Sequence, residues 1–230
     1  MDKKLSIIIP VLNEEATLEK ILERVSQVPV LDYQKEIIVV NDGSTDQTGE
    51  ILKKVKDKFN LIILKHKKNR GKGQALRTGF KVATGQVIVI QDADLEYDPN
   101  DFQKLCHVFE KTGSTVYGSR NLNPERRGYH HYVLGVWVLT LVNNLLFGSK
   151  LTDTYTCYKL FPASLIKNIP LESCGFEIEA EMTAKILKKG ESINEVAISY
   201  NPRKFKEGKK IRFKDGLKGL WTIIKCRVKS

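Results

Sequence analysis

Two aspartates separated by one residue follow a short apolar segment near the middle of the chain. The segment Val87-Ile88-Val89-Ile90 leads through Gln91 into Asp92-Ala93-Asp94. Carboxylates at this spacing, where an extended strand ends, can share one divalent cation such as Mg²⁺ or Mn²⁺, which keeps open positions for substrate phosphates. A D-x-D triplet alone equally fits an Asp-rich turn that only solvates a strand end. The apolar strand before it favours the cation site, because two acids delivered by a buried strand need a positive partner.

Two further apolar strands also end in polar clusters. Asn13-Glu14 follows the strand Leu5–Ile9, and Asn41-Asp42 follows the strand Glu36–Val40. Because ligands bind beyond the carboxyl ends of the strands in open α/β sheets, we expect these clusters to share one edge. The common nucleotide-binding motifs are absent: no P-loop exists, and Gly71-Lys72-Gly73 neither follows a strand nor continues into a dinucleotide fingerprint.

Short apolar strands alternate with helical patterns up to about residue 120, and the pattern then changes. The further predicted strands are 60–64 and 192–200, and residues 151–162 are predicted to be a loop. The predicted helices are 14–28, a segment capped by Thr45 or Asp46, 73–83, a segment opened by Pro99, 130–147, 176–189 and 214–228. This alternation predicts a doubly wound, mostly parallel α/β sheet covered by helices on both faces. No linker or repeat divides the chain, so residues 1–230 are expected to form one domain.

Positive charge is concentrated in two blocks of the 230-residue chain, whose formal net charge is +11. Residues 53–77 hold ten Lys/Arg and one acid, and residues 203–230 hold eleven Lys/Arg and two acids, so the remainder is acidic. Such blocks fit the phosphates of nucleic acid, a nucleotide or anionic lipid. The four cysteines form no C-x-x-C pair, which indicates neither a zinc site nor a disulfide framework. A cytoplasmic location is therefore expected.

Several polar stretches follow one another in an order that is itself informative. They are 9–15, 40–46, 69–73, 91–96, 118–121, 152–159, 175–179, 201–203 and 207–211. Together they resemble the nucleotide-sugar glycosyltransferases of family two, and most nearly the dolichyl- and polyprenyl-phosphate sugar transferases. The resemblance implies the GT-A fold, a Rossmann-like, mostly parallel sheet flanked by helices. It also implies a nucleotide-sugar-binding half at residues 1–120 and an acceptor-binding half with a basic C-terminal helix at residues 121–230.

The resemblance assigns donor and metal roles to residues at the strand ends. The residues implied to bind the nucleotide sugar, which would be a GDP- or UDP-hexose, are Pro10, Asn13, Glu14, Asp42 and Asp92. Arg70 and Lys72 join this set because the neighbouring glycines permit close approach to a phosphate or ribose. The implied ligands of Mg²⁺ or Mn²⁺ are Asp92, Asp94 and Glu96, the last at a position where close relatives often have Gln.

Arginines are implied to face the acceptor phosphate or the diphosphate. The acceptor set is Arg120, Arg203 and a loop arginine, Arg126 or Arg127, with Arg127 preferred. The candidate catalytic residues are Asp94, Arg120, Glu177 and Arg203. A divalent ion and arginines would stabilise the charge that develops on a diphosphate leaving group, and arginine grips phosphate in a bidentate way.

The implied reaction is metal-dependent, inverting transfer of a hexose to a polyprenyl- or dolichyl-phosphate-like lipid. Such a phosphate is already anionic, because its second pKa is about 6, and it needs no strong general base. The alternative acceptor is a sugar hydroxyl of a cell-surface glycan, which would need a base such as Glu177 or Asp153.

An alternative from another class is a basic nucleic-acid-binding module. Single-strand platforms interleave aromatic and basic side chains. Block 53–77 contains only Phe59, with Phe80 just outside it, so we expect no nucleic-acid partner.

Two segments could contact a membrane. Val133 to Phe147 is apolar apart from Asn143 and Asn144, yet it is shorter than the ~20 residues that cross a bilayer. Both a buried core helix and an amphipathic helix lying in the membrane interface fit it. The basic helix from Lys214 to Lys229 could rest on anionic headgroups, which would make the protein peripheral at the cytoplasmic membrane face.

Overall fold

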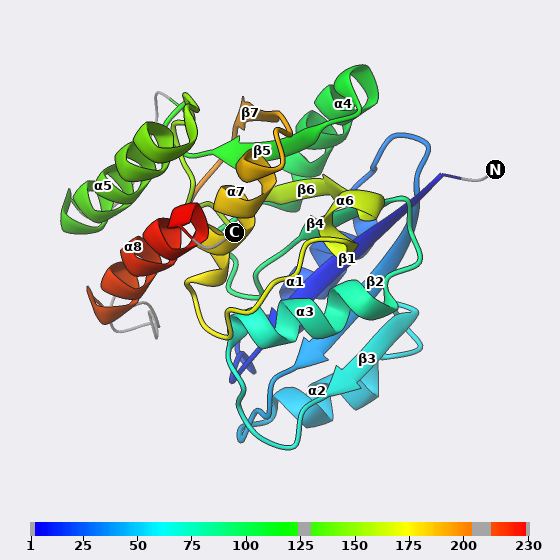
Figure 1. Cartoon of the computed structure of the whole chain (residues 1–230). Helices are drawn as coiled ribbons and strands as arrows, with labels where there is room; N and C mark the ends of the chain where they lie inside the picture. Colours follow the sequence, from blue (N-terminus) through cyan, green and yellow to red (C-terminus); the bar gives the residue numbers. More distant parts are fainter. Residues whose placement is uncertain (1–2, 124–129, 204–212, 229–230) are drawn as a thin grey trace.

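A mixed sheet of seven strands forms the centre of the molecule (Figure 1). The computed structural model describes residues 3–123, 130–203 and 213–228. The strand order is β3-β2-β1-β4-β6-β5-β7. The strands are β1 (Lys4–Val11), β2 (Gln34–Asn41), β3 (Leu61–Lys65), β4 (Val87–Ile90), β5 (Thr115–Ser119), β6 (Lys159–Pro162) and β7 (Ile193–Ala197). Within this sheet β6 is antiparallel to both of its neighbours, and the other pairings are parallel.

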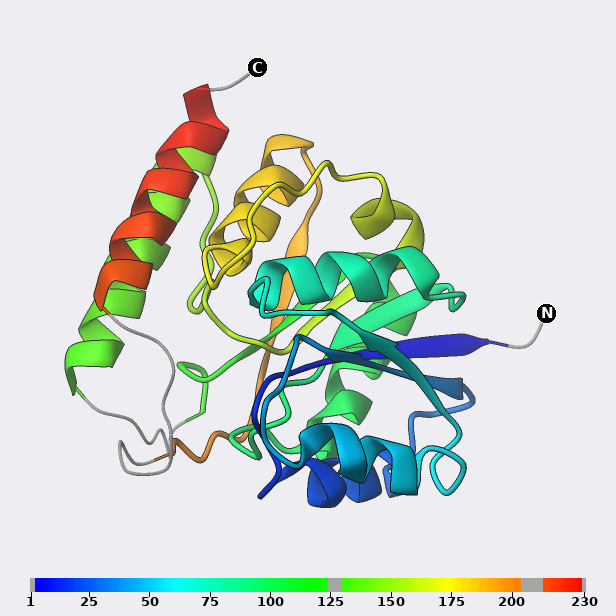
Figure 2. The same ribbon diagram turned by 90° about the horizontal axis from the view of Figure 1, so that it is seen from below.

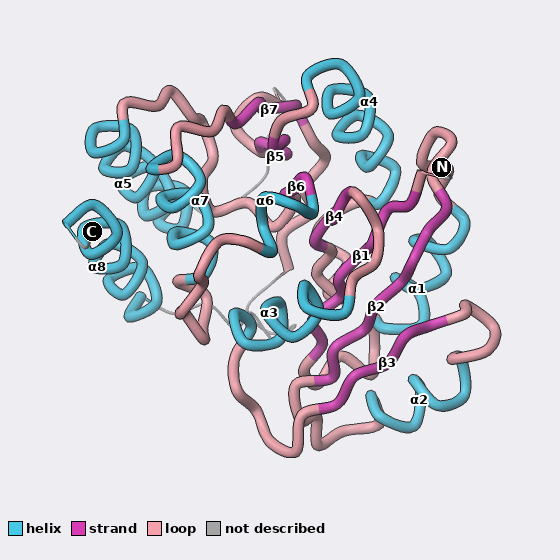
Figure 3. The backbone as a smooth tube through the Cα atoms, turned by 45° about the vertical axis from the view of Figure 1, so that its right-hand side comes forward, coloured by secondary structure: helices cyan, strands magenta, loops and turns pink. Residues whose placement is uncertain are grey.

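Helices cover both faces of the sheet (Figure 3). One face carries α1 (Leu18–Gln27), α2 (Thr48–Val55) and α4 (Phe102–Thr112), the last preceded by the 3-10 turn η1 (Pro99–Asp101). The other face carries α3 (Lys72–Val82), α6 (Ala163–Lys167) and α7 (Ile178–Lys188). Two long helices, α5 (His130–Phe147) and α8 (Phe213–Val228), pack side by side outside α7 (Figure 2).

The central strands are continuously apolar because both of their faces are buried. Every residue of β4 is at most 2% exposed, and α1 contributes four buried side chains at helical spacing, Leu18, Ile21, Leu22 and Val25. Each such side chain contributes roughly 1.5–3 kcal/mol through burial. The predicted α/β architecture is confirmed, and the predicted helices lie within a few residues of the observed ones.

The second half of the sheet departs from the prediction. Residues 151–162, predicted to be a loop, include β6, and neither β5 nor α6 was predicted. Leu160 of β6 pairs with Val89 on one side and with Val116 on the other. A strand of four residues is specified by such nonlocal partners, which no local periodicity reveals. In the first half, β1 continues past Pro10, which was predicted to close it, to Val11.

Gly79 sets how closely α3 approaches the sheet. A Cβ added there would lie 2.4 Å from Cγ2 of Ile8, a side chain with no exposed surface. We expect Gly79→Ala to lower the free energy of unfolding by about 1–2 kcal/mol, because overpacking outweighs the helix propensity gained. Urea denaturation measures the change. Gly135→Ala in α5, where a Cβ meets nothing within 4 Å, is the control and should stabilise by up to about 1 kcal/mol. Equal stabilisation of both variants would contradict this account.

Candidate active site

The loops that follow β1 and β2 are joined at the carboxyl edge of the sheet. The backbone N–H of Asn13 donates to Oγ of Ser44 at 3.0 Å, and the N–H of Thr45 donates to Oδ1 of Asn13 at 2.8 Å. Asn13 has a φ of 50°, which asparagine tolerates better than most residues. The polar clusters predicted after these two strands therefore meet at one edge, as the sequence indicated.

Asp42 anchors the loop that leads into α3. Its Oδ1 accepts the backbone N–H of Arg70 at 3.0 Å, and its Oδ2 accepts that of Gly71 at 2.8 Å. Nδ1 of His66 lies 2.6 Å from Oδ1 of Asp42, and Nε2 of His66 lies 3.0 Å from Oγ1 of Thr78. The Asp42 carboxylate, implied by the resemblance to bind the nucleotide sugar, is thus 3% exposed and bound by the protein itself. The side chain of Arg70 is exposed beside it.

Lys72 neutralises Asp92. Its Nζ lies 2.8 Å and 2.9 Å from the two oxygens of Asp92 and 3.1 Å from Oε1 of Glu179. The other oxygen of Glu179 pairs with Lys159, whose side chain is fully buried. Burial opposes the charge on Lys72, but Asp92 outweighs it and raises the pKa of Lys72 well above its ordinary value. Burial also opposes ionisation of Asp92, yet Lys72 holds the pKa of Asp92 below its ordinary value.

Arg203 lies between two acids that come from different strand ends. Its Nη2 is 2.8 Å from Oε1 of Glu14 and 3.2 Å from Oδ2 of Asp94. The backbone N–H of Arg203 donates to Oε1 of Glu96 at 2.8 Å, and the hydroxyl of Tyr200 donates to Oε2 of Glu96 at 2.9 Å. Three acids predicted from two separate stretches, Glu14, Asp94 and Glu96, are therefore gathered around Arg203.

The three carboxylates predicted as metal ligands are each bonded to groups of the protein itself. Asp92 faces Lys72, Asp94 faces Arg203, and Glu96 accepts bonds from residues 200 and 203. Within the described residues, no three His, Cys, Asp or Glu side chains converge to hold a metal ion. The cations and N–H groups of the protein balance the charge of the predicted trio. One or two carboxylates still fit Mg²⁺ or Mn²⁺ when substrate phosphates supply further oxygens.

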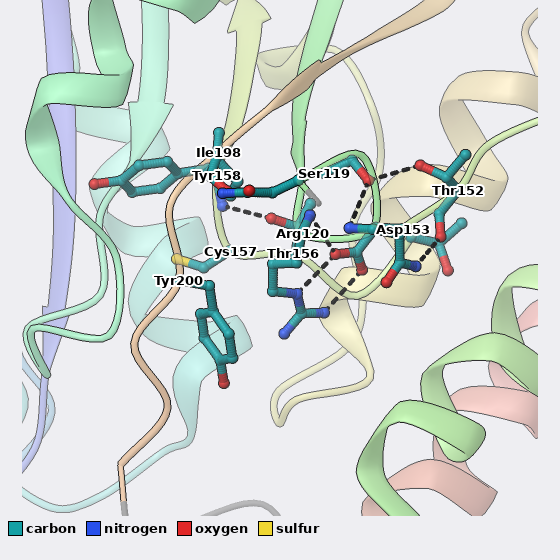
Figure 4. Close-up of polar contacts among 12 residues, drawn as sticks. Ser119, Arg120, Thr152, Asp153, Thr156, Cys157, Tyr158, Ile198 and Tyr200 are labelled. Atoms are coloured by element: carbon teal, nitrogen blue, oxygen red, sulfur yellow. Dashed lines mark hydrogen bonds and ion pairs between the residues drawn. The ribbon is translucent and has the colours of Figure 1, made fainter. Parts of the chain in front are cut away.

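Arg120 and Asp153 form a two-point ion pair (Figure 4). Nε of Arg120 lies 2.7 Å from Oδ2 of Asp153, and Nη2 lies 2.8 Å from Oδ1. The backbone N–H groups of Thr152 and Asp153 donate to Glu195, which fixes the loop behind the pair. Burial opposes the charge of Arg120, but Asp153 keeps the pKa of Arg120 well above its ordinary value. Asp153 itself has no exposed surface, so it does not suit the role of general base that the sequence left open for it.

Glu177, the other candidate base, is also engaged. Its Oε1 accepts the backbone N–H of Gly175 at 3.0 Å, and its Oε2 is buried without a hydrogen-bond partner among the described residues. Arg126 and Arg127 lie outside the described residues. The acceptor contact predicted for one of these arginines therefore stays a prediction.

Residues 6–169 match the family described as Glycosyl transferase family 2. The chain belongs to this family. A dolichol-phosphate mannosyltransferase from Pyrococcus furiosus is 36% identical over 118 residues, a match that spans 51% of this chain and 33% of that protein. A dolichyl-phosphate beta-glucosyltransferase from Trichomonas vaginalis is 28% identical over 247 residues, covering 97% of this chain and 72% of that protein.

A solved structure has the same fold. It is the glucosyl-3-phosphoglycerate synthase of Mycobacterium tuberculosis in complex with Mn²⁺, UDP and glucosyl-3-phosphoglycerate. The TM-score is 0.71 at 19% identity, with 98% of this chain and 80% of that chain covered. This family 2 glycosyltransferase therefore has the GT-A fold that its sequence predicted.

Sequence reasoning missed several residues of this glycosyltransferase's site. They are His66, Lys159, Glu179 and Tyr200. Lys159 and Glu179 lie inside the family-like stretches 152–159 and 175–179, so a signal for them existed, although residue type alone assigned no role. A lone histidine in a basic run, such as His66, carries no comparable signal.

The outer face of helices α5 and α8 is apolar. Leu139, Ala180 and Ile223 are buried where α5 and α8 meet α7. Large apolar side chains that are 39–78% exposed cover the outside: Leu134, Trp137, Val138, Leu141, Leu145, Leu217, Trp221, Ile224 and Val228. α5 is thus buried on one face, while its other face is apolar and exposed. Among the described residues, no helix has both the length and the apolar character needed to cross a membrane.

The ion pair of Lys72 and Asp92 should make stability depend on pH. We expect Lys72→Met to lower the free energy of unfolding at pH 7 by about 2–3 kcal/mol, because Asp92 loses its partner in a largely buried position. The folded-state pKa of Asp92 lies below the unfolded value of about 4, so the stabilisation is present above that pH and lost as pH falls through the folded-state pKa. The difference from wild type should therefore shrink below about pH 4.

Urea denaturation at pH 7 and at acidic pH measures this difference. The matched control is Lys58→Met, because Lys58 forms an exposed pair with Glu19 at 3.4 Å and should contribute only about 0–1 kcal/mol. A loss that is the same at both pH values would contradict the assignment.

Proposed function

We propose that this glycosyltransferase moves a hexose from GDP- or UDP-hexose to a polyprenyl- or dolichyl-phosphate-like lipid, with inversion and with Mg²⁺ or Mn²⁺. The observation that carries the proposal is Arg203, which bridges Glu14 and Asp94 at the carboxyl edge of the sheet. A guanidinium between acids at a ligand-binding edge suits a diphosphate with its divalent counter-ion. In this proposal residues 1–120 bind the nucleotide sugar and residues 121–230 bind the acceptor.

The donor side uses charges that are already paired in the free protein. Lys72 keeps Asp92 ionised, and Arg203 holds Asp94 until a diphosphate competes for the guanidinium. A bound divalent ion would neutralise the negative charge of the leaving diphosphate. Asp94 is the carboxylate best suited to hold this ion. Arg203 would add hydrogen bonds to the same developing charge. The Mn²⁺ and UDP in the solved mycobacterial relative support this class of ligand.

The reaction is a single in-line displacement. An oxygen of the acceptor phosphate forms a bond to the anomeric carbon of the hexose while the bond from that carbon to the diphosphate oxygen breaks. The electron pair of the broken bond leaves with the nucleoside diphosphate, and the configuration at the anomeric carbon inverts. No proton has to be removed, because a phosphate monoester with a second pKa of about 6 is already an anion near neutral pH.

The contacts of the candidate base Asp153 favour a phosphate acceptor over a sugar hydroxyl. Asp153 is buried against Arg120, and one oxygen of Glu177 is bonded while the other is buried. A hydroxyl acceptor would need one of them to accept its proton. Arg120, with 16% of its side chain exposed, can meet an anion without such a base. The dolichol- and dolichyl-phosphate acceptors named for the mannosyl- and glucosyltransferase relatives belong to the same class.

Nucleic-acid binding has little support. Phe59 is 9% exposed and Phe80 is 4% exposed, so the first basic block offers no aromatic platform for bases. Its lysines include Lys53, which pairs with Glu50 on the exposed face of α2.

We also propose that the outer face of α5 and α8 rests on an anionic membrane, where a lipid acceptor would be found. The two helices lie side by side and, among their described residues, together expose nine large apolar side chains, more than the singly scattered apolar residues of an ordinary surface. α8 adds exposed basic side chains to it, Lys214, Lys218, Lys225 and Arg227. A helix pair with this composition suits the boundary between headgroups and acyl chains.

The metal and donor assignment is tested by Asp94→Ala. We expect wild type to be stabilised by UDP or GDP far more with Mn²⁺ than without it, because a ligand that binds only the folded state raises the melting temperature. Asp94→Ala should lose the Mn²⁺-dependent part and reduce sugar transfer to farnesyl phosphate by at least about 100-fold. Thermal shift and a transfer assay measure the two effects. Asp57→Ala, at an exposed turn after α2, is the control. Full turnover by Asp94→Ala would refute the assignment.

The membrane assignment is tested by flotation with vesicles of phosphatidylcholine and phosphatidylglycerol. We expect salt-sensitive binding by wild type and at least about a tenfold loss in the double variant Trp137→Ser, Trp221→Ser, because these exposed indoles are suited to the interface. Leu31→Ser is the matched control, since Leu31 is 49% exposed and is not part of α5 or α8. Equal flotation of the double variant and wild type would count against the proposal.

A further inference from the structure

An aromatic stack runs from the core to the candidate site and ends at Arg120. Ring centroids lie 5.3 Å apart for Phe102 and Tyr158, 4.8 Å for Tyr158 and Tyr97, and 5.3 Å for Tyr97 and Tyr200. Cζ of Arg120 lies 5.1 Å from the ring centroid of Tyr200. Figure 4 shows Tyr200 beside the Arg120 guanidinium, with Tyr158 deeper in the molecule. The first three rings are almost fully buried, so the last ring rests on a rigid base.

The backbone around Tyr200 is fixed to the segment that follows β4. Tyr200 forms an antiparallel bridge with Tyr97, and the N–H of Asn201 donates to the carbonyl of Glu96 at 2.8 Å. These bonds hold the chain between β7 and Arg203 against the segment that carries Asp94 and Glu96. Tyr200 therefore has a defined position relative to both sides of the site.

Two polar contacts of Tyr200 lead to different functional groups. Its hydroxyl donates to Oε2 of Glu96 at 2.9 Å, on the metal and diphosphate side. The guanidinium of Arg120, on the acceptor side, lies over the Tyr200 ring at a distance typical of a cation–π contact. Burial, and then the Glu96 carboxylate, raise the pKa of Tyr200, so the hydroxyl stays protonated and remains a donor.

We propose that Tyr200 is a positioning residue that couples the two sides of the site, orienting Glu96 through its hydroxyl and Arg120 through its ring. The inference rests on the proposed function for the role of Arg120, and on the metal-ligand role that the family resemblance implies for Glu96. It goes further in assigning a role to Tyr200, which the proposed function does not use. A tyrosine that only filled space would not need its hydroxyl.

Separate removal of the hydroxyl and the ring tests this coupling. Tyr200→Phe keeps the ring and loses the bond to Glu96, whereas Tyr200→Leu loses both contacts. The first readout is the Mn²⁺ concentration that gives half of the thermal stabilisation by UDP or GDP. The second is the KM for farnesyl phosphate with the nucleotide sugar that the wild-type enzyme uses.

We expect Tyr200→Phe to need at least about tenfold more Mn²⁺, because loss of a bond that orients a metal ligand typically costs that much affinity. Its KM for farnesyl phosphate should stay within about twofold of wild type. Tyr200→Leu should show the same Mn²⁺ change and also raise this KM by about three- to tenfold, since the guanidinium loses its cation–π partner. In a Glu96→Gln background, Tyr200→Phe should have little further effect on the Mn²⁺ requirement.

Tyr33→Phe is the matched control, because Tyr33 also donates its hydroxyl to a carboxylate, that of Glu110, but precedes the amino end of β2. It should change neither readout. An unchanged Mn²⁺ requirement in Tyr200→Phe, or an equal rise in the KM of both Tyr200 variants, would overturn the coupling. The response of wild type to Mn²⁺ and nucleotide tests the proposed function, while the difference between wild type and variants tests Tyr200, so the two ideas can fail separately.

Discussion

Carboxylates at the carboxyl edge of the sheet each need a cation, and this requirement organises the site. An ion left unpaired in a largely buried position costs several kcal/mol, which the fold avoids by bringing a basic residue to each acid. Lys72 comes from the start of α3, Arg120 follows β5, and Arg203 follows β7. Their partners follow β1 or β4, lie in the loop before β6, or belong to α7. The pairs therefore join segments that are far apart along the chain and give the edge its shape before any ligand binds.

The sheet topology makes these pairings possible. Because β6 is inserted antiparallel between β4 and β5, the strands β5 and β7 extend the parallel part of the sheet without reversing its carboxyl edge. The segments after them then reach the same edge as the D-x-D triplet. A donor diphosphate would enter a set of existing charge pairs rather than an empty acidic pocket, and it would have to compete for Arg203.

The outer helices are joined to the candidate site by a hydrogen bond and by packing contacts. The hydroxyl of Thr140 in α5 accepts the backbone N–H of Thr154 at 3.2 Å, and Tyr155 packs into the cluster shared by α5, α7 and α8. The same loop carries Asp153, the partner of Arg120. A surface suited to lipid thus connects, through one loop of a few residues, with the arginine proposed to meet the acceptor phosphate. Such a connection is expected if the acceptor approaches from the membrane.

The sequence by itself determined the α/β class, the first four strands and the polar clusters at their ends, because apolar strands and turn residues are local signals. Family-like stretches also indicated Asp94, Arg120 and Arg203. Only the tertiary structure decided which charges meet, that groups of the protein pair with all three predicted metal ligands, and that Tyr200 lies between Glu96 and Arg120. It also decided that residues 159–162 form a strand. These features depend on contacts between residues distant in the chain, for which neither periodicity nor residue type carries a signal.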